Sequence, residues 1–383
     1  MQIIWVILSS LWCILAIGAF LLLKSRYDAL LPLGSSPSAT IDPPSISVII
    51  PARDEAENIG KCLESLTKQI YPHKTLKILV VDDGSTDDTI LIAQGYMDQS
   101  IQVELIDAGV LPPGWLGKSH ACWVGANSTH TDWLCFVDAD TRHAPELISA
   151  AIHSAIDEEV DLLTLHPRQE MLGFWERLLM PIPFMTLMIL LDAQGINNPK
   201  SEKALANGQF ILIKKEVYVS IGGHAAIHDQ VLEDVAIARL VKSSGFKLKL
   251  LGGSELIRTR MYTQLKTLWE GLARGGSELF GVPLTILAVL SSALTAFIPI
   301  AYPIWRLMLA WQRYDGITIL SALLACAGSV AWYGAHTLAF HHYRVPYRYL
   351  LLLPLSNLLI ALVNAEGIIR RMRSQRIWKG RTI

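Results

Sequence analysis

Charged side chains are scarce in this chain, and the two signs nearly cancel. Asp, Glu, Lys and Arg make up 17% of the 383 residues, and the formal net charge is −1. A nucleic-acid-binding protein needs a basic excess, so no nucleic-acid partner is expected. Hydrophobic residues make up 51% of the chain, more than an ordinary soluble protein carries. The composition therefore indicates a membrane protein.

The sequence also lacks paired-cysteine motifs and a nucleoside-triphosphate-binding motif. The chain has five cysteines, and no two of them form a C-x-x-C pair. This argues against a disulfide framework and against a structural zinc site. Lys118 follows Gly117, but the G-x-x-x-x-G-K-[ST] spacing of a P-loop is missing, so the sequence does not predict an ATPase.

Long hydrophobic runs are present at both ends of the chain. Residues 1–23 carry no charge and are long enough to cross a bilayer, which takes about 20 residues. Three later runs are Phe280–Trp305, Gly316–Phe340 and Tyr349–Ala365. We predict an N-terminal transmembrane anchor over 1–23 and a C-terminal transmembrane region of about three spans over 280–365.

The first run reads as a retained anchor rather than a cleaved signal peptide. It lacks a basic start and a small-residue cleavage site. Lys24 and Arg26 follow it directly, and basic residues prefer the cytoplasmic side, so the middle of the chain is expected in the cytoplasm.

The span count then creates a conflict. With a cytoplasmic middle domain, three C-terminal spans would put the basic tail, residues 366–383, outside, which the same rule disfavours. One segment is therefore expected to be a hairpin, a re-entrant stretch or an interfacial helix. The proline-interrupted "TAFIPIAYPIW" is the first suspect.

Residues 24–45 form a predicted linker, rich in Pro, Ser and Gly from Leu30 on. Residues 46–279 then alternate between strand and helix patterns. Strands are predicted over 46–52, 76–85, 101–108 and 131–140, and helices over 56–70, 86–97 and 118–128. Thr86 or Asp87 is the expected N-cap of the second helix. This alternation predicts an α/β domain with a mostly parallel, Rossmann-like sheet.

Polar clusters follow three of the predicted strands. They are "PARDEAEN", "DDGSTDD" and "DADT". In parallel sheets, ligands bind outside the carboxyl ends of the strands, so these clusters are expected at one binding edge.

Asp138 and Asp140, in "CFVDADT", are the candidate metal ligands. Alternate positions of a strand face the same side, and paired carboxylates are oxygen ligands that suit Mg²⁺ or Mn²⁺. The competing interpretation is a solvated loop with one Asp capping the next helix. The position after the fourth strand favours the metal site.

Two other pairs of acids carry a functional and a plain interpretation, and Lys118 carries a functional one. Asp82 and Asp83 either hold a base or ribose or simply form a turn at Gly84. Lys118, before a helix, is placed to meet a phosphate. Glu233 and Asp234 are either first-turn acids favoured by the helix dipole or a general base for an acceptor hydroxyl.

The later part of the domain is less regular. Leu178–Leu191 is apolar but too short to span a bilayer easily, so it is either a buried core helix or an interfacial helix near a lipid. A helix is predicted in "VLEDVAIARLVKSSG", and another in "QLKTLWEGLARG" before the C-terminal spans.

In order along the chain, "SVIIPARDEAENI", "ILVVDDGSTDDT", "GWLGKSHA", "FVDADT" and "LEDVAIARLVKSSGF" resemble the family 2 glycosyltransferases. The resemblance covers about residues 46–280. The N-terminal anchor, "PPGWLGK" and "RMY…WEG" are similar to the membrane-bound branch associated with hopanoid and carotenoid glycosylation. The resemblance implies a GT-A fold, a nucleotide-sugar donor, taken from the family to be a UDP-sugar, and inversion at the anomeric carbon.

The resemblance also implies roles for individual residues. The nucleotide-binding residues are Pro51, Ala52, Arg53, Glu55, Asp82 and Asp83, the donor-contacting lysine is Lys118, the metal-binding pair is Asp138 and Asp140, and the catalytic base is Asp234 beside Glu233. Of the metal pair, we expect Asp140 to contact Mg²⁺ or Mn²⁺ directly and Asp138 to lie nearer the ribose.

The chain departs from the family at the Q-x-x-R-W motif of processive members. "QLKTLW" has Gln264 and Trp269 but no Arg and one residue too many. Arg274 is the candidate for the missing cation. The departure favours transfer of a single sugar over polymer synthesis.

Together these features predict an inverting enzyme that moves a sugar to a hydroxyl of a membrane lipid, with a carotenoid or hopanoid as candidate acceptor. Its partners would be the bilayer, the lipid and the donor, and its location a bacterial inner membrane with the catalytic domain facing the cytoplasm. Transfer to polyprenyl phosphate or a glycerolipid is the alternative within enzymes. A silent membrane scaffold is the alternative outside them.

Overall fold

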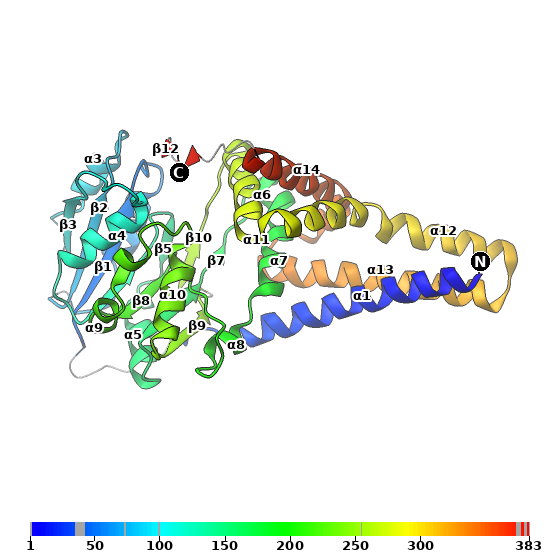
Figure 1. Ribbon diagram of the computed structural model, residues 1–383, viewed down its shortest axis with the longest axis horizontal. Helices are drawn as coiled ribbons and strands as arrows, with labels where there is room; N and C mark the ends of the chain where they lie inside the picture. Colours follow the sequence, from blue (N-terminus) through cyan, green and yellow to red (C-terminus); the bar gives the residue numbers. More distant parts are fainter. Residues whose placement is uncertain are drawn as a thin grey trace.

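The computed structural model describes residues 2–34, 43–72, 74–98, 100–253, 255–372, 377–378 and 381–382, without the side chains of 276–280, 377–378 and 381–382. A sheet-containing domain lies at one end of the molecule, and a bundle of long helices extends away from it (Figure 1). The sequence-based division into a middle α/β domain and terminal helices matches this arrangement.

The main sheet has seven strands in the order β3-β2-β1-β4-β8-β6-β9. Its strands are β1 Ile46–Ala52, β2 Leu76–Asp82, β3 Gln102–Asp107, β4 Trp133–Phe136, β6 Leu162–His166, β8 Ile211–Lys214 and β9 Leu248–Gly252. Neighbours pair in parallel except β8, which is antiparallel to both β4 and β6. The prediction of a mostly parallel sheet is confirmed.

Helices cover both faces of this sheet. One apolar cluster joins the sheet to α2 Ile59–Leu66, α3 Thr89–Gln94 and α5 Leu147–Asp157. The other joins it to α4 Gly117–Asn127 and α10 Glu233–Ser243.

The alternation along β1 explains the two layers, because Val48 and Ile50 face the first cluster while Ile49 faces the second. Gly125 lets α4 approach closely, since a Cβ there would lie 2.6 Å from Ile49.

The remaining elements of the domain are short. They are β5 Thr141–His143, β7 Arg168–Gln169, β10 Ile257–Thr259, α8 Ala193–Asn197, α9 Lys215–Ser220 and the 3₁₀ helix η1 Gly223–Ile227. Strands β5, β10 and β7 form a second small sheet. Near the end of the chain, β11 Ile377–Trp378 pairs with β12 Arg381–Thr382.

Two local predictions were wrong. β4 ends at Phe136, so Asp138 and Asp140 lie on the turn after the strand and not on one face of it. The N-cap of α3 is Asp88 rather than Thr86 or Asp87. Asp87 instead accepts a local hydrogen bond from the Thr89 N–H group and one from the Ala56 N–H group, and the latter joins the loop after β2 to the loop after β1.

The apolar stretch Leu178–Leu191 forms the end of α6 Phe174–Leu179 and α7 Pro181–Leu190. Leu179 and Met180 are fully buried and share an apolar cluster with Phe340 and Tyr349. The core interpretation therefore describes the first part of the stretch, while Leu190 near its end is 59% exposed. Helices α6 and α7 lie between the α/β domain and the long helices (Figure 1).

The bundle consists of α1 Gln2–Ala29, α11 Leu265–Thr295, α12 Ile298–Arg313, α13 Gly316–His342 and, after the 3₁₀ helix η2 Tyr347–Leu352, α14 Leu353–Met372. Helix α1 thus continues past the predicted end of the anchor into the predicted linker. Beyond α1, Leu33 donates a 2.8 Å hydrogen bond to the Gly252 carbonyl at the sheet edge.

By length and composition, three described segments could cross a membrane: α1, α13 and Tyr347–Met372. Gly281–Thr295 and Ile298–Arg313 could form a fourth, broken span, because they meet at a bend of 43°. The break falls inside "TAFIPIAYPIW", the segment suspected from its prolines. α11 itself is kinked at Gly281, whose φ is 69°.

Contacts along the bundle give the helix directions. Gln2 bonds to Asp315, and the Tyr27 ring stacks on His342 at 4.3 Å, so α1 and α13 run parallel. Helix α12 runs the opposite way. The Trp5 and Trp305 ring centroids are 4.7 Å apart and the Ser9 and Tyr302 hydroxyl oxygens are 2.7 Å apart, so later residues of α1 meet earlier residues of α12.

Helix α14 returns toward the α/β domain. Near its start, Asn357 accepts a 3.1 Å hydrogen bond from Thr295, and near its end Glu366 accepts a 2.6 Å hydrogen bond from Trp269, in the second turn of α11. Since α13 also ends at the domain, the chain between α13 and α14 doubles back within the bundle. The doubling-back segment is therefore the one that leads into α14, while "TAFIPIAYPIW" is a bend.

Candidate active site

A cavity of about 560 Å³ opens at the carboxyl ends of β1, β2 and β4. Parallel neighbours bring these ends to one edge, and β8, running the other way, brings the loop before its first residue to the same edge. Eleven predicted site residues line the cavity: Pro51, Ala52, Arg53, Glu55, Asp83, Lys118, Asp138, Asp140, Glu233, Asp234 and Arg274.

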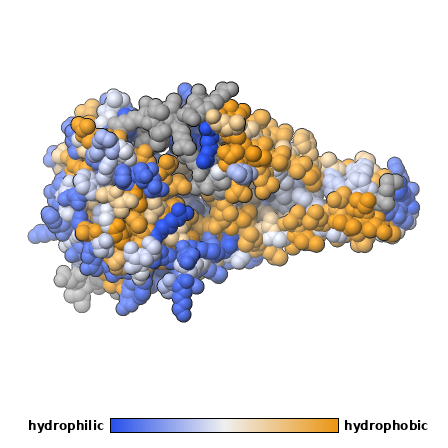
Figure 2. Space-filling model, viewed as in Figure 1, coloured by the Kyte–Doolittle hydropathy of each residue, from blue (hydrophilic) through white to orange (hydrophobic). Residues whose placement is uncertain are grey.

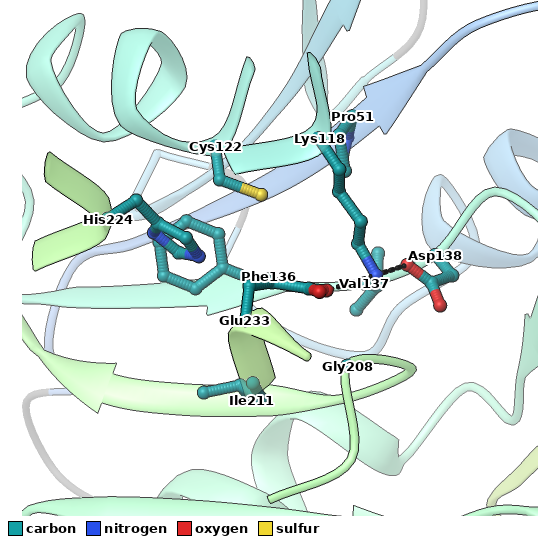
Figure 3. Close-up of a pocket in the computed structure, with 10 residues that line it drawn as sticks. All are labelled: Pro51, Lys118, Cys122, Phe136, Val137, Asp138, Gly208, Ile211, His224 and Glu233. Atoms are coloured by element: carbon teal, nitrogen blue, oxygen red, sulfur yellow. Dashed lines mark ion pairs between the residues drawn. The ribbon is translucent and has the colours of Figure 1, made fainter. Parts of the chain in front are cut away.

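Lys118 links two of the acids. It lies in the first turn of α4, and its ammonium group is 2.8 Å from Asp138 Oδ1 and 2.6 Å from Glu233 Oε1 (Figure 3). Burial alone would lower the pKa of Lys118, but the two carboxylates outweigh it and raise the pKa well above its ordinary value. Lys118 is therefore a permanent cation between the turn after β4 and the start of α10.

Asp140 has the environment of a cation ligand. Desolvation by the surrounding protein, together with the negative charge of Asp138, raises the pKa of Asp140 to about 7. Its Oδ1 atom is buried and has no hydrogen-bond partner among the described residues. A divalent cation would satisfy that oxygen and offset the repulsion, so the donor set of Asp138 and Asp140 fits Mg²⁺ or Mn²⁺.

The protein alone supplies few ligands for such an ion. Among the described residues there is no group of three or more His, Cys, Asp or Glu side chains placed to hold a metal. A site of two carboxylates is typical of Mg²⁺ bound together with substrate phosphates.

Asp234 is held by backbone amides. Its Oδ2 accepts a 2.9 Å hydrogen bond from the Gly208 N–H, and its Oδ1 accepts one of 2.8 Å from Val235. Desolvation and the neighbouring charge of Glu233 nevertheless raise the pKa of Asp234 to about 6. A carboxylate with this pKa is suited to accept a proton near neutral pH.

Asp82 and Asp83 have different surroundings in the structure. Asp82 does not line the cavity, and its carboxylate accepts hydrogen bonds from the N–H groups of Gly84 and Ser85. Asp83 does line it, and Arg53 donates a 2.6 Å hydrogen bond to its carbonyl oxygen. The plain interpretation of a turn thus describes Asp82, where Gly84 has a φ of 72°.

The start of α11 closes the cavity on the side of the bundle. Arg274 lies there with Tyr262, which packs on the helix so closely that a Cβ at Gly271 would be 2.2 Å from its hydroxyl. Trp269 faces Glu366 of α14 instead of the cavity, and Gln264 is the N-cap of α11.

Sequence reasoning missed several residues of this site. Gly208 carries no signal in "NGQF" beyond being a glycine, because its role depends on α10 and α4 meeting over it. Trp115 and Leu232 border recognised motifs, but only the structure shows that both line one cavity. Proximity to the "GWLGK" and "LED" motifs was the available signal.

Known proteins that resemble this chain are glycosyltransferases, which agrees with a cavity suited to a nucleotide-sugar. A family model described as "Glycosyl transferase family 2" matches residues 47–222. This part of the chain is a family 2 glycosyltransferase domain.

The glycosyltransferase domain has relatives among bacterial enzymes. Two are the proteins named 4,4'-diaponeurosporenoate glycosyltransferase from Staphylococcus aureus strains MRSA252 and USA300. The first is 29% identical to this chain over 230 residues, and the second is 29% identical over 233 residues. Each match covers 59% of this chain and 59% of the relative's length.

A solved structure supports the fold over nearly the whole chain. It is the mannosyltransferase PcManGT from Pyrobaculum calidifontis, determined in complex with GDP-Man and Mn²⁺. The alignment covers 96% of this chain and 99% of that one at a TM-score of 0.54 and 17% identity. The α/β domain therefore has the fold of glycosyltransferases, and terminal helices are part of the alignment.

Proposed function

We propose that this protein transfers a single sugar from a nucleotide-sugar donor to a lipid acceptor, with inversion at the anomeric carbon. One observation carries the proposal. The two carboxylates suited to a metal, the cation Lys118 and the carboxylate Asp234 converge on one cavity whose far wall is the start of α11. That helix continues into a segment that could cross a membrane.

The donor would bind along the ends of β1, β2 and β4. Arg53 and Asp83 would hold the nucleoside, and Lys118 would meet the diphosphate because its ammonium group lies 2.8 Å from Asp138 Oδ1. Asp140 would be the direct ligand of Mg²⁺ or Mn²⁺, with Asp138 nearer the ribose. When bound, such an ion supplies positive charge that stabilises the departing diphosphate.

Asp234 would act as the general base. It would take the proton of an acceptor hydroxyl, and the resulting nucleophile would attack the anomeric carbon from the face opposite the diphosphate. One displacement inverts the configuration and needs no covalent intermediate on the protein. Glu233, held by Lys118, would keep the start of α10 in place.

The acceptor class rests on the relatives and on the helices. The Staphylococcus aureus relatives are named for glycosylation of 4,4'-diaponeurosporenoate, so a carotenoid or a similar isoprenoid is the preferred acceptor here, with a hopanoid next. UDP is the preferred nucleotide from the family alone. Polyprenyl phosphate or a glycerolipid is the competing acceptor.

The helix directions support a location at a bacterial inner membrane with the catalytic domain in the cytoplasm. Helices α1 and α13 both end at the domain, and α14 returns to it, so Lys24, Arg26 and the basic end of α14 are on the same side as the domain. This arrangement satisfies the preference of basic residues for the cytoplasm and removes the conflict in the span count.

Donor titration tests the proposal. Purified protein is titrated by calorimetry with UDP- and GDP-sugars, with Mn²⁺ and without it. Metal-dependent binding of one donor is expected, and Asp140→Asn should abolish the metal dependence. A silent scaffold would bind no donor under either condition, and that result would refute the proposal.

A further inference from the structure

The catalytic cavity has an apolar side that the donor and metal residues do not explain. It is formed by Leu111, Trp115 and Leu116 before α4 and by Val231 and Leu232 before α10, and we call these five residues the apolar wall. We propose that the apolar wall receives the hydrocarbon part of the acceptor next to its reactive oxygen, and so selects acceptors by apolar surface. The proposal rests on the proposed function and names the part of the site that recognises the acceptor.

The first argument is position. Val231 and Leu232 directly precede Glu233 and Asp234, at the start of α10. A nucleophile must come within about 2.6–3.2 Å of its general base. The carbon atoms attached to that nucleophile must then lie against the residues beside Asp234, and two of these are aliphatic.

The second argument is that the two segments form one surface. Leu116 donates a 2.9 Å hydrogen bond to the His228 carbonyl, and the Trp115 ring lies 5.3 Å from the His228 ring. Trp115 also packs against Trp123 at 5.4 Å. These contacts fix Trp115 and the backbone of Leu116 against the loop that leads to Val231 and Leu232, so the two segments border the cavity together.

The third argument is exposure. Val231 is 43% exposed and Leu232 is 37% exposed, although both directly precede the acids Glu233 and Asp234 in the chain. Binding a hydrocarbon chain here would remove apolar surface of both partners from water, which is favourable roughly in proportion to the area buried. A sugar or phosphate acceptor would instead leave its polar groups against aliphatic side chains, which costs free energy.

The fourth argument is access from the bundle. Met261 and Tyr262 also line the cavity, and the first turns of α11 follow them in the chain. Met261 is 39% exposed, and the second part of α11 is the first of the two bent helices that could cross a membrane. The visible surface of the helical bundle is largely hydrophobic (Figure 2). A lipid leaving the bilayer along α11 would reach the cavity with its polar end first.

Trp115 alone has a second interpretation, because an aromatic face can also stack on a sugar ring. The two interpretations differ in what Trp115→Leu does. Leucine keeps an apolar side chain at the wall but removes the aromatic face. A hydrocarbon acceptor should tolerate this change, and a stacked sugar acceptor should not.

The test uses the full chain in detergent with the straight-chain alcohols from 1-butanol to 1-octanol as acceptor probes. Donor and Mn²⁺ are saturating, release of the nucleoside diphosphate is measured above the rate of donor hydrolysis, and the alkyl glycoside is identified by mass. We expect kcat/KM to rise roughly fourfold per added methylene while the chain remains on the wall. Ratios between variants cancel the partition of each alcohol into micelles.

Val231→Asn and Leu232→Asn should flatten this dependence on chain length, Trp115→Leu should preserve it, and the KM for donor should stay the same in all three. Leu91→Asn is the matched control, because Leu91 is an aliphatic residue on α3 that is 67% exposed and lies outside the cavity lining. Donor binding with transfer that is absent, independent of chain length, or equally steep in the Asn variants would overturn the apolar wall. Absence of donor binding would overturn the proposed function as well.

Discussion

The ammonium group of Lys118 lies 2.8 Å from a carboxylate oxygen of Asp138, so the cation on α4 and the first acid of the turn after β4 form an ion pair inside the candidate site. The same ammonium group contacts Glu233 at 2.6 Å. One lysine thus connects the proposed metal site to the helix that carries the proposed base. A substitution of Lys118 should therefore weaken donor binding more than it destabilises the fold.

Lys118→Met should weaken donor binding by about 10- to 100-fold, because a hydrogen bond to a charged group contributes about 1.5–3 kcal/mol. The measurement is calorimetric titration with nucleotide-sugar in the presence of Mn²⁺. Lys68→Met is the control, because Lys68 forms a surface ion pair with Glu64 on α2. Unchanged donor affinity in the Lys118 variant would contradict its role at the diphosphate.

The rate of transfer should depend on pH through Asp234. A base must be ionised, and desolvation raises the pKa of Asp234 to about 6, so kcat should be level above that pH and fall about tenfold per pH unit below it. A pH–rate profile with donor and acceptor saturating measures this.

Asp234→Asn should lower kcat by about 10²- to 10⁴-fold and remove the acid limb of the profile. Asp98→Asn, a change at an exposed position outside the cavity, is the matched control. An acceptor phosphate is already ionised and needs no base, so a variant that keeps most of its activity would point to polyprenyl phosphate.

Gly208 should be intolerant of a side chain. A Cβ at this position would lie 2.9 Å from the Lys118 ammonium, 3.3 Å from Glu233 Oε1 and 3.5 Å from Asp234 Oδ2. Gly208→Ala should therefore displace the flexible end of Lys118 and lower kcat by about tenfold or more, while the thermal unfolding midpoint changes by only a few degrees. Gly18→Ala serves as the control, because the new methyl group would meet nothing within 4 Å beyond its chain neighbours and the adjacent backbone of its own helix. Equal kcat in both variants would show that the packing at Gly208 is unimportant for the reaction.

Much of this site could be predicted from sequence because its acids lie in short motifs next to strands and helices. Asp138, Asp140, Glu233 and Asp234 each follow a strand or begin a helix, and parallel strands bring such ends to one edge. Gly208 and the apolar wall could not be predicted, because their roles depend on segments far apart in the chain meeting at the cavity. Asp83 lines the cavity and Asp82 does not. This difference depends on the geometry of the turn, which cannot be predicted from two identical residues side by side.

The bundle illustrates the same limit. Hydropathy located its apolar segments, and the prolines located the bend near Thr295. Hydropathy does not give direction, however, so the return of α14 along α11 appeared only through contacts such as the one between Trp269 and Glu366.

Thiol labelling can test that return. Tyr314 and Met372 are 72% and 77% exposed, and they lie at the end of α12 and the end of α14. In sealed vesicles, an impermeant maleimide should label Tyr314→Cys and Met372→Cys from opposite sides, with Met372→Cys on the side of the catalytic domain. Lys68→Cys, on the surface of that domain, marks its side. Labelling of both bundle positions from one side would contradict the helix directions.

The most direct test of the whole account is sugar incorporation into lipid. Membranes containing the wild-type chain or Asp234→Asn are incubated with radiolabelled nucleotide-sugar and Mn²⁺, and the organic-solvent extract is counted and analysed by mass spectrometry. The account predicts a hexosylated isoprenoid in the wild-type extract and almost none with the variant. Donor that is consumed equally by both, with no label in the lipid extract, would contradict it.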